Sequence, residues 1–294
     1  MPHTLVAQLT DCHVVATGGT LFGWVDPNAR LAAAVAYLNR LNPRPDVVVL
    51  SGDLVDGGRV EEYHALRAIL GDLAIPFLLL PGNHDDRDNM RAVFPEHDYL
   101  PREGFLNWSV EVQGMRLVGL DTQLTGQPIG QVCHERADWL ARTLAAHSCQ
   151  PTLLFMHHPP FLTGVEMLDV MGCTGTDRLA MALADQRHVE AILCGHHHVS
   201  MVTHWNHVLA MVAPATSYRI AAEEMPPRWV LEPPACMLHT WRRGAGLISR
   251  VALVEAYASD PLGKALPIRV DAACVDVAHD EVLPSGGLDM LLGA

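Results

Sequence analysis

The sequence predicts an α/β protein in which mixed β-sheets are covered by helices. Strand-like apolar runs alternate with amphipathic helical segments in the first half of the 294-residue chain. The second half adds antiparallel hairpins, and 49% of all residues are hydrophobic, which is enough to bury a large core. Strand–helix alternation favours parallel pairing, whereas hairpins add antiparallel strands, so we expect both kinds of pairing in the sheets.

The first half of the chain supplies the alternating elements. Asp26 followed by Pro27 is a typical N-cap and first helical residue, and it marks the start of the first helix. Period-3.6 spacing marks the second helix. The expected elements are a strand at 5–9, a helix at 29–41, a strand at 47–50, a helix at 60–73 and a strand at 77–80.

The second half adds hairpins and two more helices. Gln113-Gly114 and the glycine-containing segment 243–246 are typical of hairpin turns. The expected elements are strands at 106–112 and 115–120, a helix at 134–147, a strand at 152–156, a helix at 177–186, a strand at 189–194, and hairpins at 199–212 and 237–254. The proline-rich segment 225–234 interrupts this pattern, and we expect a lid or a dimer arm there.

The composition excludes several classes of protein. The net charge is −13 and the 20 Lys and Arg residues do not cluster, which argues against a nucleic-acid polymer as partner. No apolar run reaches about 18 residues and no signal segment opens the sequence, so we expect neither membrane insertion nor export. The seven cysteines form no CxxC pair, which favours reduced thiols in a cytoplasmic protein.

Five short polar motifs follow directly on predicted strands. They are Asp11-Cys12-His13, Gly52-Asp53, Gly82-Asn83-His84-Asp85, His157-His158-Pro159 and Gly195-His196-His197-His198. Ligands of open α/β sheets bind beyond the carboxyl ends of the strands, so one rim can collect all five. Residues i and i+2 point the same way in extended backbone. We therefore expect Asp11 and His13 to face one metal, and His196 and His198 to do the same.

The motifs offer the carboxylates of Asp11 and Asp53, one amide and several imidazoles, the ligand types of a site for two divalent metals. This mixture suits Fe, Mn, Zn or Co better than Ca²⁺. Two divalent cations outweigh two carboxylates in charge, and the surplus favours an anion. Each motif alone has an ordinary explanation as a turn, a cap or a buried histidine. Their joint occurrence in this order does not.

The order D-x-H, GD, GNHD, HxP and GHxH, within residues 4–205, resembles the calcineurin-like metallophosphoesterases. Within that family it resembles the class III cyclic-nucleotide and glycerophosphodiester phosphodiesterases. The resemblance implies a four-layer α/β/β/α sandwich of two mixed sheets with a small C-terminal cap hairpin. We therefore expect a catalytic domain at 1–215, a cap or dimerisation segment with returning strands at 216–257, and a peripheral tail at 258–294.

The resemblance also implies the roles of individual residues. Asp53 would bridge two metals, the first held with Asp11, His13 and His198 and the second with Asn83, His157 and His196. His84 would contact the phosphoryl group and protonate the leaving group. Asp85 would orient the His84 imidazole.

The implied activity is that of a metal-dependent phosphodiesterase. We expect a metal-bound hydroxide to attack a small phosphodiester, either a glycerophosphodiester or a 3′,5′-cyclic nucleotide, or both. The pair Gly57-Gly58 lacks the arginine that the protein-phosphatase branch carries there, which disfavours phosphoprotein substrates. A phosphomonoesterase, a nucleotide pyrophosphatase and a non-catalytic metal-binding protein are the alternatives. A homodimer or larger homo-oligomer is expected through the cap.

Several aromatic and histidine residues near the motifs have two open interpretations. His158 either lines the substrate pocket or braces the rim. Phe22 and Trp24 either shape that pocket or only pack. Cys12 and His197 are expected to pack beside the ligands, and Trp229 is expected in the core or at an interface.

Overall fold

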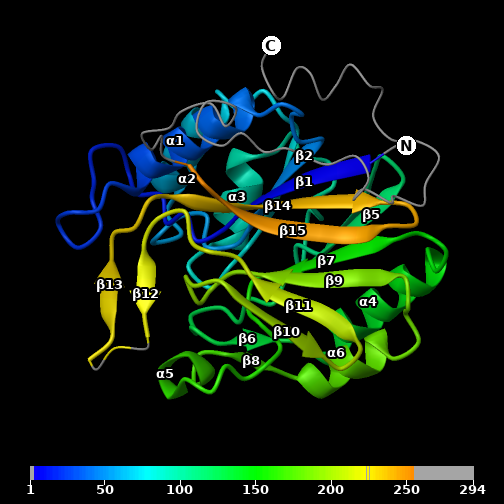
Figure 1. Cartoon of the computed structure of the whole chain (residues 1–294). Coiled ribbons are helices and arrows are strands. Elements are labelled where there is room, and N and C mark those ends of the chain that lie inside the picture. Colours follow the sequence, from blue (N-terminus) through cyan, green and yellow to red (C-terminus); the bar gives the residue numbers. More distant parts are fainter. Residues whose placement is uncertain (1–2, 223, 225, 255–294) are drawn as a thin grey trace, which may run out of the picture. The chain divides into compact units, whose positions relative to one another are not determined.

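Two β-sheets form the centre of the structure, a computed structural model that describes residues 3–254 except 223 and 225 (Figure 1). The first sheet has five strands, in the order β15 (Gly246–Leu253), β14 (Ala235–Arg242), β1 (His3–Leu9), β2 (Val47–Ser51) and β3 (Phe77–Leu80). The second has six, in the order β10 (Met201–Trp205), β11 (Val208–Val212), β9 (Val189–Cys194), β7 (Thr152–Met156), β5 (Met115–Leu120) and β4 (Trp108–Val112). The tail expected at 258–294 lies outside the described residues.

Both sheets are mixed, as predicted. In the first sheet β1, β2 and β3 are parallel, and β14 and β15 add antiparallel strands at one side. In the second sheet β5, β7, β9 and β11 are parallel, and antiparallel β4 and β10 form its two edges. The parallel strands bring several carboxyl ends to one rim, which is where the polar motifs lie.

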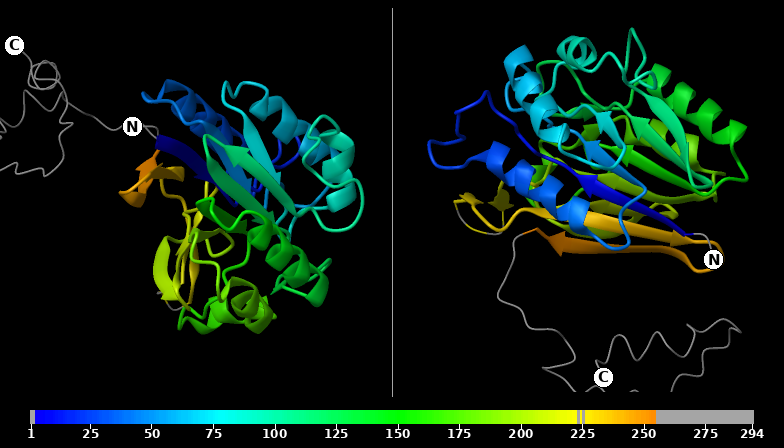
Figure 2. Two further views of the ribbon diagram at one scale, coloured as in Figure 1. Left: turned by 90° about the vertical axis from the view of Figure 1, so that its right-hand side faces the viewer. Right: turned by 90° about the horizontal axis from the view of Figure 1, so that it is seen from above.

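Helices cover the outer face of each sheet, which makes four layers (Figure 2). α1 (Pro27–Arg40) and α2 (Val60–Leu70) pack on the first sheet, and α4 (His134–Ala146) and α6 (Thr176–Leu183) pack on the second. Alternation along β7 shows the layering. Leu153 and Phe155 join the core shared with the first sheet, whereas Leu154 and Met156 pack with the core that contains α4 and α6.

The start of α1 follows the predicted capping chemistry. Asp26 has an extended backbone, and its Oδ1 accepts a hydrogen bond from the backbone N of Ala29 at 2.9 Å. Pro27 occupies the first turn, where it needs no hydrogen-bond donor. Leu31, Val35 and Leu38 are buried along one face of the helix, as helical periodicity requires.

Several short elements were not predicted because they span too few residues to show a periodicity. They are α3 (Arg87–Val93), α5 (Glu166–Asp169), the parallel pair β6 (Gly130–Gln131) and β8 (Cys173–Thr174), and the antiparallel pair β12 (Arg219–Ala221) and β13 (Arg228–Val230). β13 lies within the proline-rich segment, and its expected role in oligomerisation stays a prediction. No helix among the described residues is long and apolar enough to cross a membrane.

A buried polar chain ties the two sheets together. Gln8 Nε2 donates to Ser51 Oγ at 2.8 Å, and to the carbonyl oxygen of Cys194 in the second sheet at 3.1 Å. His239 lies with Nε2 3.1 Å from Gln8 Oε1 and with Nδ1 2.7 Å from Ser249 Oγ. Burial lowers the pKa of His239 to about 3, so the imidazole is neutral in the folded protein.

We predict that acidification destabilises the fold partly through His239. Its folded pKa is about 3, and the unfolded chain protonates near its ordinary value of about 6.5. The unfolded state therefore binds the extra proton below that pH, and about 2 kcal/mol of the free energy of unfolding should be lost between pH 7 and 5. Urea unfolding at both pH values checks this. His239→Gln should show a smaller drop than the wild type.

The exposed His204 provides a control. His204→Gln should keep the wild-type pH dependence of unfolding. An equal drop in the wild type and both variants would rule out the contribution of His239.

Candidate metal centre

The five polar motifs meet at one rim of the two sheets. Asp11, Asp53 and Asn83 follow β1, β2 and β3 of the first sheet, and His157 and His196 follow β7 and β9 of the second. Segments far apart in sequence therefore supply one site. All the motif histidines except His84 are buried.

Two buried carboxylates lie at the centre of this site. Asp11 is 0% and Asp53 is 2% exposed. The Nε2 atom of His157 lies 3.3 Å from Asp53 Oδ2 and 3.9 Å from Asp11 Oδ1. His13 Nε2 lies 3.6 Å from Asp53 Oδ2, and His198 Nε2 lies 3.4 Å from Asp11 Oδ1. Three imidazoles thus direct a ring nitrogen toward the same carboxylate oxygens.

In these three imidazoles the other ring nitrogen lies near an oxygen acceptor, and one ring nitrogen of His196 does so too. The pairs are His13 Nδ1 with Asp56 Oδ1 at 3.1 Å, His157 Nδ1 with Ser51 O at 3.0 Å, His198 Nδ1 with Tyr218 O at 2.8 Å, and His196 Nε2 with Met171 O at 2.9 Å. An acceptor on one side holds the N–H there and leaves a lone pair on the other nitrogen. Histidines that bind metals have this arrangement.

The donor set fits divalent cations. Single ligand atoms of Asp11, His13 and His198 lie within 4.8 Å of one another, as do those of Asp11, Asp53 and His157. Asn83 Oδ1 is buried and has no hydrogen-bond partner. A buried amide oxygen without a partner is costly, and coordination to a cation would satisfy it.

The electrostatics of the site favour positive charge. Burial raises the pKa of Asp53, but the neighbouring imidazoles, His157 first among them, hold it well below the ordinary value. Burial lowers the pKa of His157, yet Asp53 and Asp11 raise it to about 9. The carboxylates therefore attract a proton or a cation to this point. Burial lowers the pKa of His198 to about 4 and that of His196 well below its ordinary value, so both are neutral donors.

Extended backbone was expected to point Asp11 and His13 the same way, and likewise His196 and His198, and this expectation was wrong. The backbone there is left-handed rather than extended, with φ of 51° at Asp11, 47° at His13, 73° at His196 and 53° at His198. His198 groups with Asp11 and His13, whereas His196 groups with His157, so His196 and His198 do not face one site. Left-handed backbone in residues other than glycine is strained and clusters at functional sites.

Two motif glycines allow the backbone to approach the carboxylates. A Cβ atom at Gly82 would collide with Asp53, and one at Gly195 would collide with Thr10 and Asp11. Any side chain at these positions would displace a carboxylate of the site. The glycines in the motifs are therefore explained by close packing rather than by turn geometry alone.

The expectation that Asp85 orients His84 was wrong. The Asp85 carboxylate is buried and accepts hydrogen bonds from Tyr63 Oη at 2.8 Å, Gly82 N at 2.8 Å and Leu54 N at 3.1 Å. Asp85 thus secures the loops around the site. The Nδ1 atom of His84 lies 2.6 Å from the carbonyl oxygen of Asp56 instead. Asp56 therefore contacts both His13 and His84, and no sequence motif indicated it.

A cavity of about 430 Å³ opens above the carboxylates. One side is formed by residues of the motifs: His13, Asp53, Asn83, His84, His196 and His198. The remainder includes Met167, Met171, Tyr218, Ile220 and Trp229. Tyr218, which directly precedes β12, was not predicted to be near the site. Trp229 lies on β13, within the segment 225–234 where a lid or a dimer arm was expected, and it is 54% exposed rather than buried in the core.

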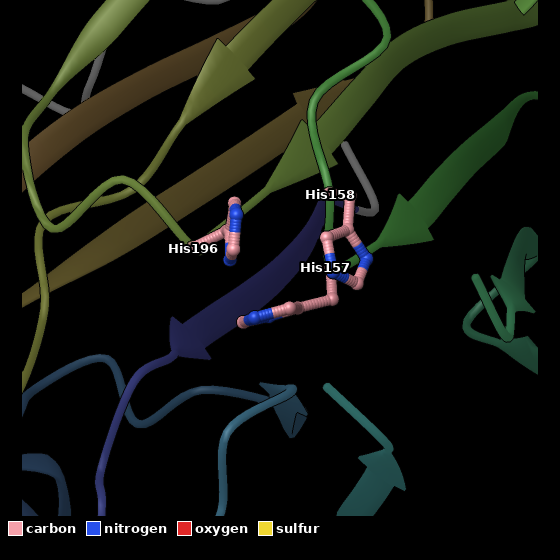
Figure 3. Close-up of side chains that lie close together, drawn as sticks. All are labelled: His157, His158 and His196. Atoms are coloured by element: carbon pink, nitrogen blue, oxygen red, sulfur yellow. The ribbon is translucent and has the colours of Figure 1, made fainter. Parts of the chain in front are cut away.

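His158 braces the rim and is not among the residues that line the cavity. It is fully buried, and its Nδ1 lies 2.8 Å from Thr122 Oγ1. Figure 3 shows His157 and His158 pointing in different directions, with His196 nearby. The ring planes of His157 and His158 are 86° apart. The ring centroids of His158 and His196 are 4.5 Å apart. Phe22 and Trp24 do not line the cavity directly either.

Comparison with known proteins identifies the family. A family model described as calcineurin-like phosphoesterase matches residues 4–200. A protein named probable glycerophosphodiester phosphodiesterase, from Arcobacter nitrofigilis, is 33% identical over 257 residues, which are 86% of this chain and 94% of that protein. A probable cyclic nucleotide phosphodiesterase from Rhodopseudomonas palustris is 34% identical over 224 residues, which are 73% of this chain and 80% of that protein.

The solved structures agree with the arrangement of layers. The crystal structure of a dimetal phosphatase from Danio rerio matches with a TM-score of 0.61 at 12% identity, covering 87% of this chain and 100% of that chain. At this identity the likeness concerns the fold alone. With the family match over 4–200, the mixed four-layer fold and the polar rim, the chain belongs to the calcineurin-like phosphoesterase family.

Proposed function

We propose that this protein is a metal-dependent phosphodiesterase acting on small phosphodiesters, either glycerophosphodiesters or 3′,5′-cyclic nucleotides, or both. The observation that carries the proposal is the pair of ligand clusters around Asp11 and Asp53 beneath a cavity of about 430 Å³. A cavity of this volume is in the usual range for small-molecule sites. The names of the two relatives support both substrate classes.

The proposed ligands divide between two cations that share Asp53. The first set is Asp11, His13, Asp53 and His198, and the second is Asp53, Asn83, His157 and His196. The close approach of His13 Nε2 to His198 Nε2, at 3.2 Å, and the lone Asn83 Oδ1 support this division. The mixture of nitrogen and oxygen donors suits Fe, Mn, Zn or Co. When bound, such cations neutralise phosphoryl charge and activate water.

The proposed role of His84 is to donate a proton to the leaving-group oxygen. Its side chain is 39% exposed and lines the cavity. Its ring packs edge-on against His13, with centroids 4.6 Å apart. The Nδ1 atom faces the Asp56 carbonyl oxygen at 2.6 Å, which leaves Nε2 for the substrate.

The central test compares a phosphodiester with a phosphomonoester on metal-reconstituted protein. We expect kcat/KM for bis(p-nitrophenyl) phosphate to exceed that for p-nitrophenyl phosphate by at least about tenfold, a difference of about 1.4 kcal/mol in transition-state stabilisation. The reverse order would make the protein a monoesterase. Metal-loaded protein that hydrolyses neither ester would contradict an enzymatic role.

We predict that Asp53→Asn removes metal as well as activity. The change halves the negative charge at the centre of the site, because Asp11 is then the only carboxylate of the central pair. Because altering even an outer partner of a metal ligand costs about 10–100-fold in affinity or activity, kcat should fall by more than about 100-fold. Metal content per chain, measured by plasma mass spectrometry, should fall with it. Asp138→Asn, at an exposed position on α4, is the matched control and should change neither.

We predict that His84→Gln acts on the leaving group. Loss of a general acid costs about 10²–10⁴-fold when the leaving group needs a proton. Hydrolysis of an alkyl diester such as glycerophosphoethanolamine should therefore slow by at least about 100-fold, and that of bis(p-nitrophenyl) phosphate by much less. Metal content should be unchanged. Equal slowing of both substrates would argue against the role of an acid.

A further inference from the structure

A row of aromatic rings leads from the metal centre to the surface. The Tyr218 ring lies 4.4 Å from that of His198 and 5.7 Å from that of His13, measured between centroids. Phe22 meets Tyr218 edge-on at 5.2 Å. Phe22 also stacks on Trp229, with centroids 4.0 Å apart and planes 8° from parallel. The row therefore connects the proposed ligands with the arm formed by β12 and β13.

Trp229 has one covered face and one open face. The nearly parallel stack with Phe22 covers one side of the indole. Trp229 is nevertheless 54% exposed, and it lines the cavity above the carboxylates. The exposed part must then lie on the opposite face and the edges of the ring. Because Phe22 holds the indole in place, little conformational entropy is lost when a ligand packs on it.

The wall that contains Trp229 is largely apolar. Met167, Met171, Ile220 and Pro227 line the cavity together with Trp229. Arg228 is the polar neighbour on this side, and its Nε lies 3.1 Å from Glu224 Oε2. A hydroxylated group placed against this wall would lose hydrogen bonds to water without replacement. A planar ring would instead gain stacking and apolar contact.

We propose that Trp229, backed by Phe22, determines specificity by stacking on a planar ring carried by the ester group of the substrate. The ring is of the nucleobase or aryl class. This inference rests on the proposed phosphodiesterase function, because it assumes that the phosphoryl group sits over the carboxylates. It favours heterocyclic diesters over glycerol diesters among the substrates of that function.

The test compares 3′,5′-cyclic AMP with sn-glycero-3-phosphoethanolamine. Stacking on an aromatic side chain is worth about tenfold or more in binding, so Trp229→Ala should lower kcat/KM for cyclic AMP by about tenfold. The value for the glycerol diester should change by less than about twofold, because that substrate has no ring to stack. Trp229→Leu should behave like the alanine variant, since it keeps apolar volume without a flat face. Trp229→Phe should retain most of the activity toward cyclic AMP.

Trp24 is the matched control. It lies in the same loop as Phe22, with ring centroids 6.4 Å apart and planes tilted by 39° rather than stacked, is 50% exposed and is not among the residues that line the cavity. Trp24→Ala should leave both substrates unaffected. Unchanged kcat/KM for cyclic AMP in Trp229→Ala would overturn the proposal. Equal losses of kcat/KM for both substrates in Trp229→Ala would also overturn it, because the arm would then have only a structural role. This holds whether or not gel filtration shows a change of oligomeric state.

Equilibrium binding separates this proposal from the proposed function. Calorimetric titration with both diesters uses metal-loaded His84→Gln with and without Trp229→Ala, because the slowed hydrolysis of this variant keeps the diesters intact during the titration. Selective weakening of cyclic AMP binding would support the stacking role even in a protein that hydrolyses neither compound. Hydrolysis of both diesters with equal binding in the two proteins would preserve the function and refute the stacking role.

Discussion

The metal centre depends on the burial of two carboxylates at the ends of neighbouring strands. Asp11 and Asp53 are almost completely removed from water, and buried charge is costly unless it is paired and hydrogen-bonded. The backbone N of His196 reaches both oxygens of Asp11 at 3.0 Å, and that of His84 reaches Asp53 Oδ1 at 2.9 Å. These hydrogen bonds reduce the free-energy cost of burial, but they leave the negative charges in place. The surrounding imidazoles offset part of the remaining negative charge, and in the proposed function bound cations would offset the rest.

The fold accepts local strain in order to hold these carboxylates. Left-handed backbone at residues with a side chain costs about 1–2 kcal/mol each, and it occurs at Asp11, His13, Asp53, His196 and His198. Each of these loops begins at the carboxyl end of a buried parallel strand, which fixes where the loop starts. Buried hydrogen bonds of His239 with Gln8 and Ser249 add polar contacts beneath the same rim. Strain at the site is thus balanced by packing in the two sheets.

The floor and the wall of the cavity have different structural origins. The floor is made by residues at the carboxyl ends of strands, which the hydrogen bonding of the sheets holds in register. The wall is made by the arm together with Met167 and Met171, and Phe22 stacks on Trp229 of the arm without lining the cavity itself. In the proposed function, substitution in the wall should therefore alter the ester group that binds without disturbing the carboxylates.

The sequence by itself determined the layered α/β class, most strands and long helices, and the group of residues at the rim. Local periodicity predicts elements such as β7 and α1, and a polar motif after a buried strand indicates a site at its carboxyl end. Only the tertiary structure decided that the i, i+2 spacing does not bring His196 and His198 to one point, that Asp56 rather than Asp85 contacts His84, and that Trp229 reaches the cavity. Left-handed loop geometry and contacts between residues far apart in sequence decide these features, and neither leaves a periodic pattern in the chain.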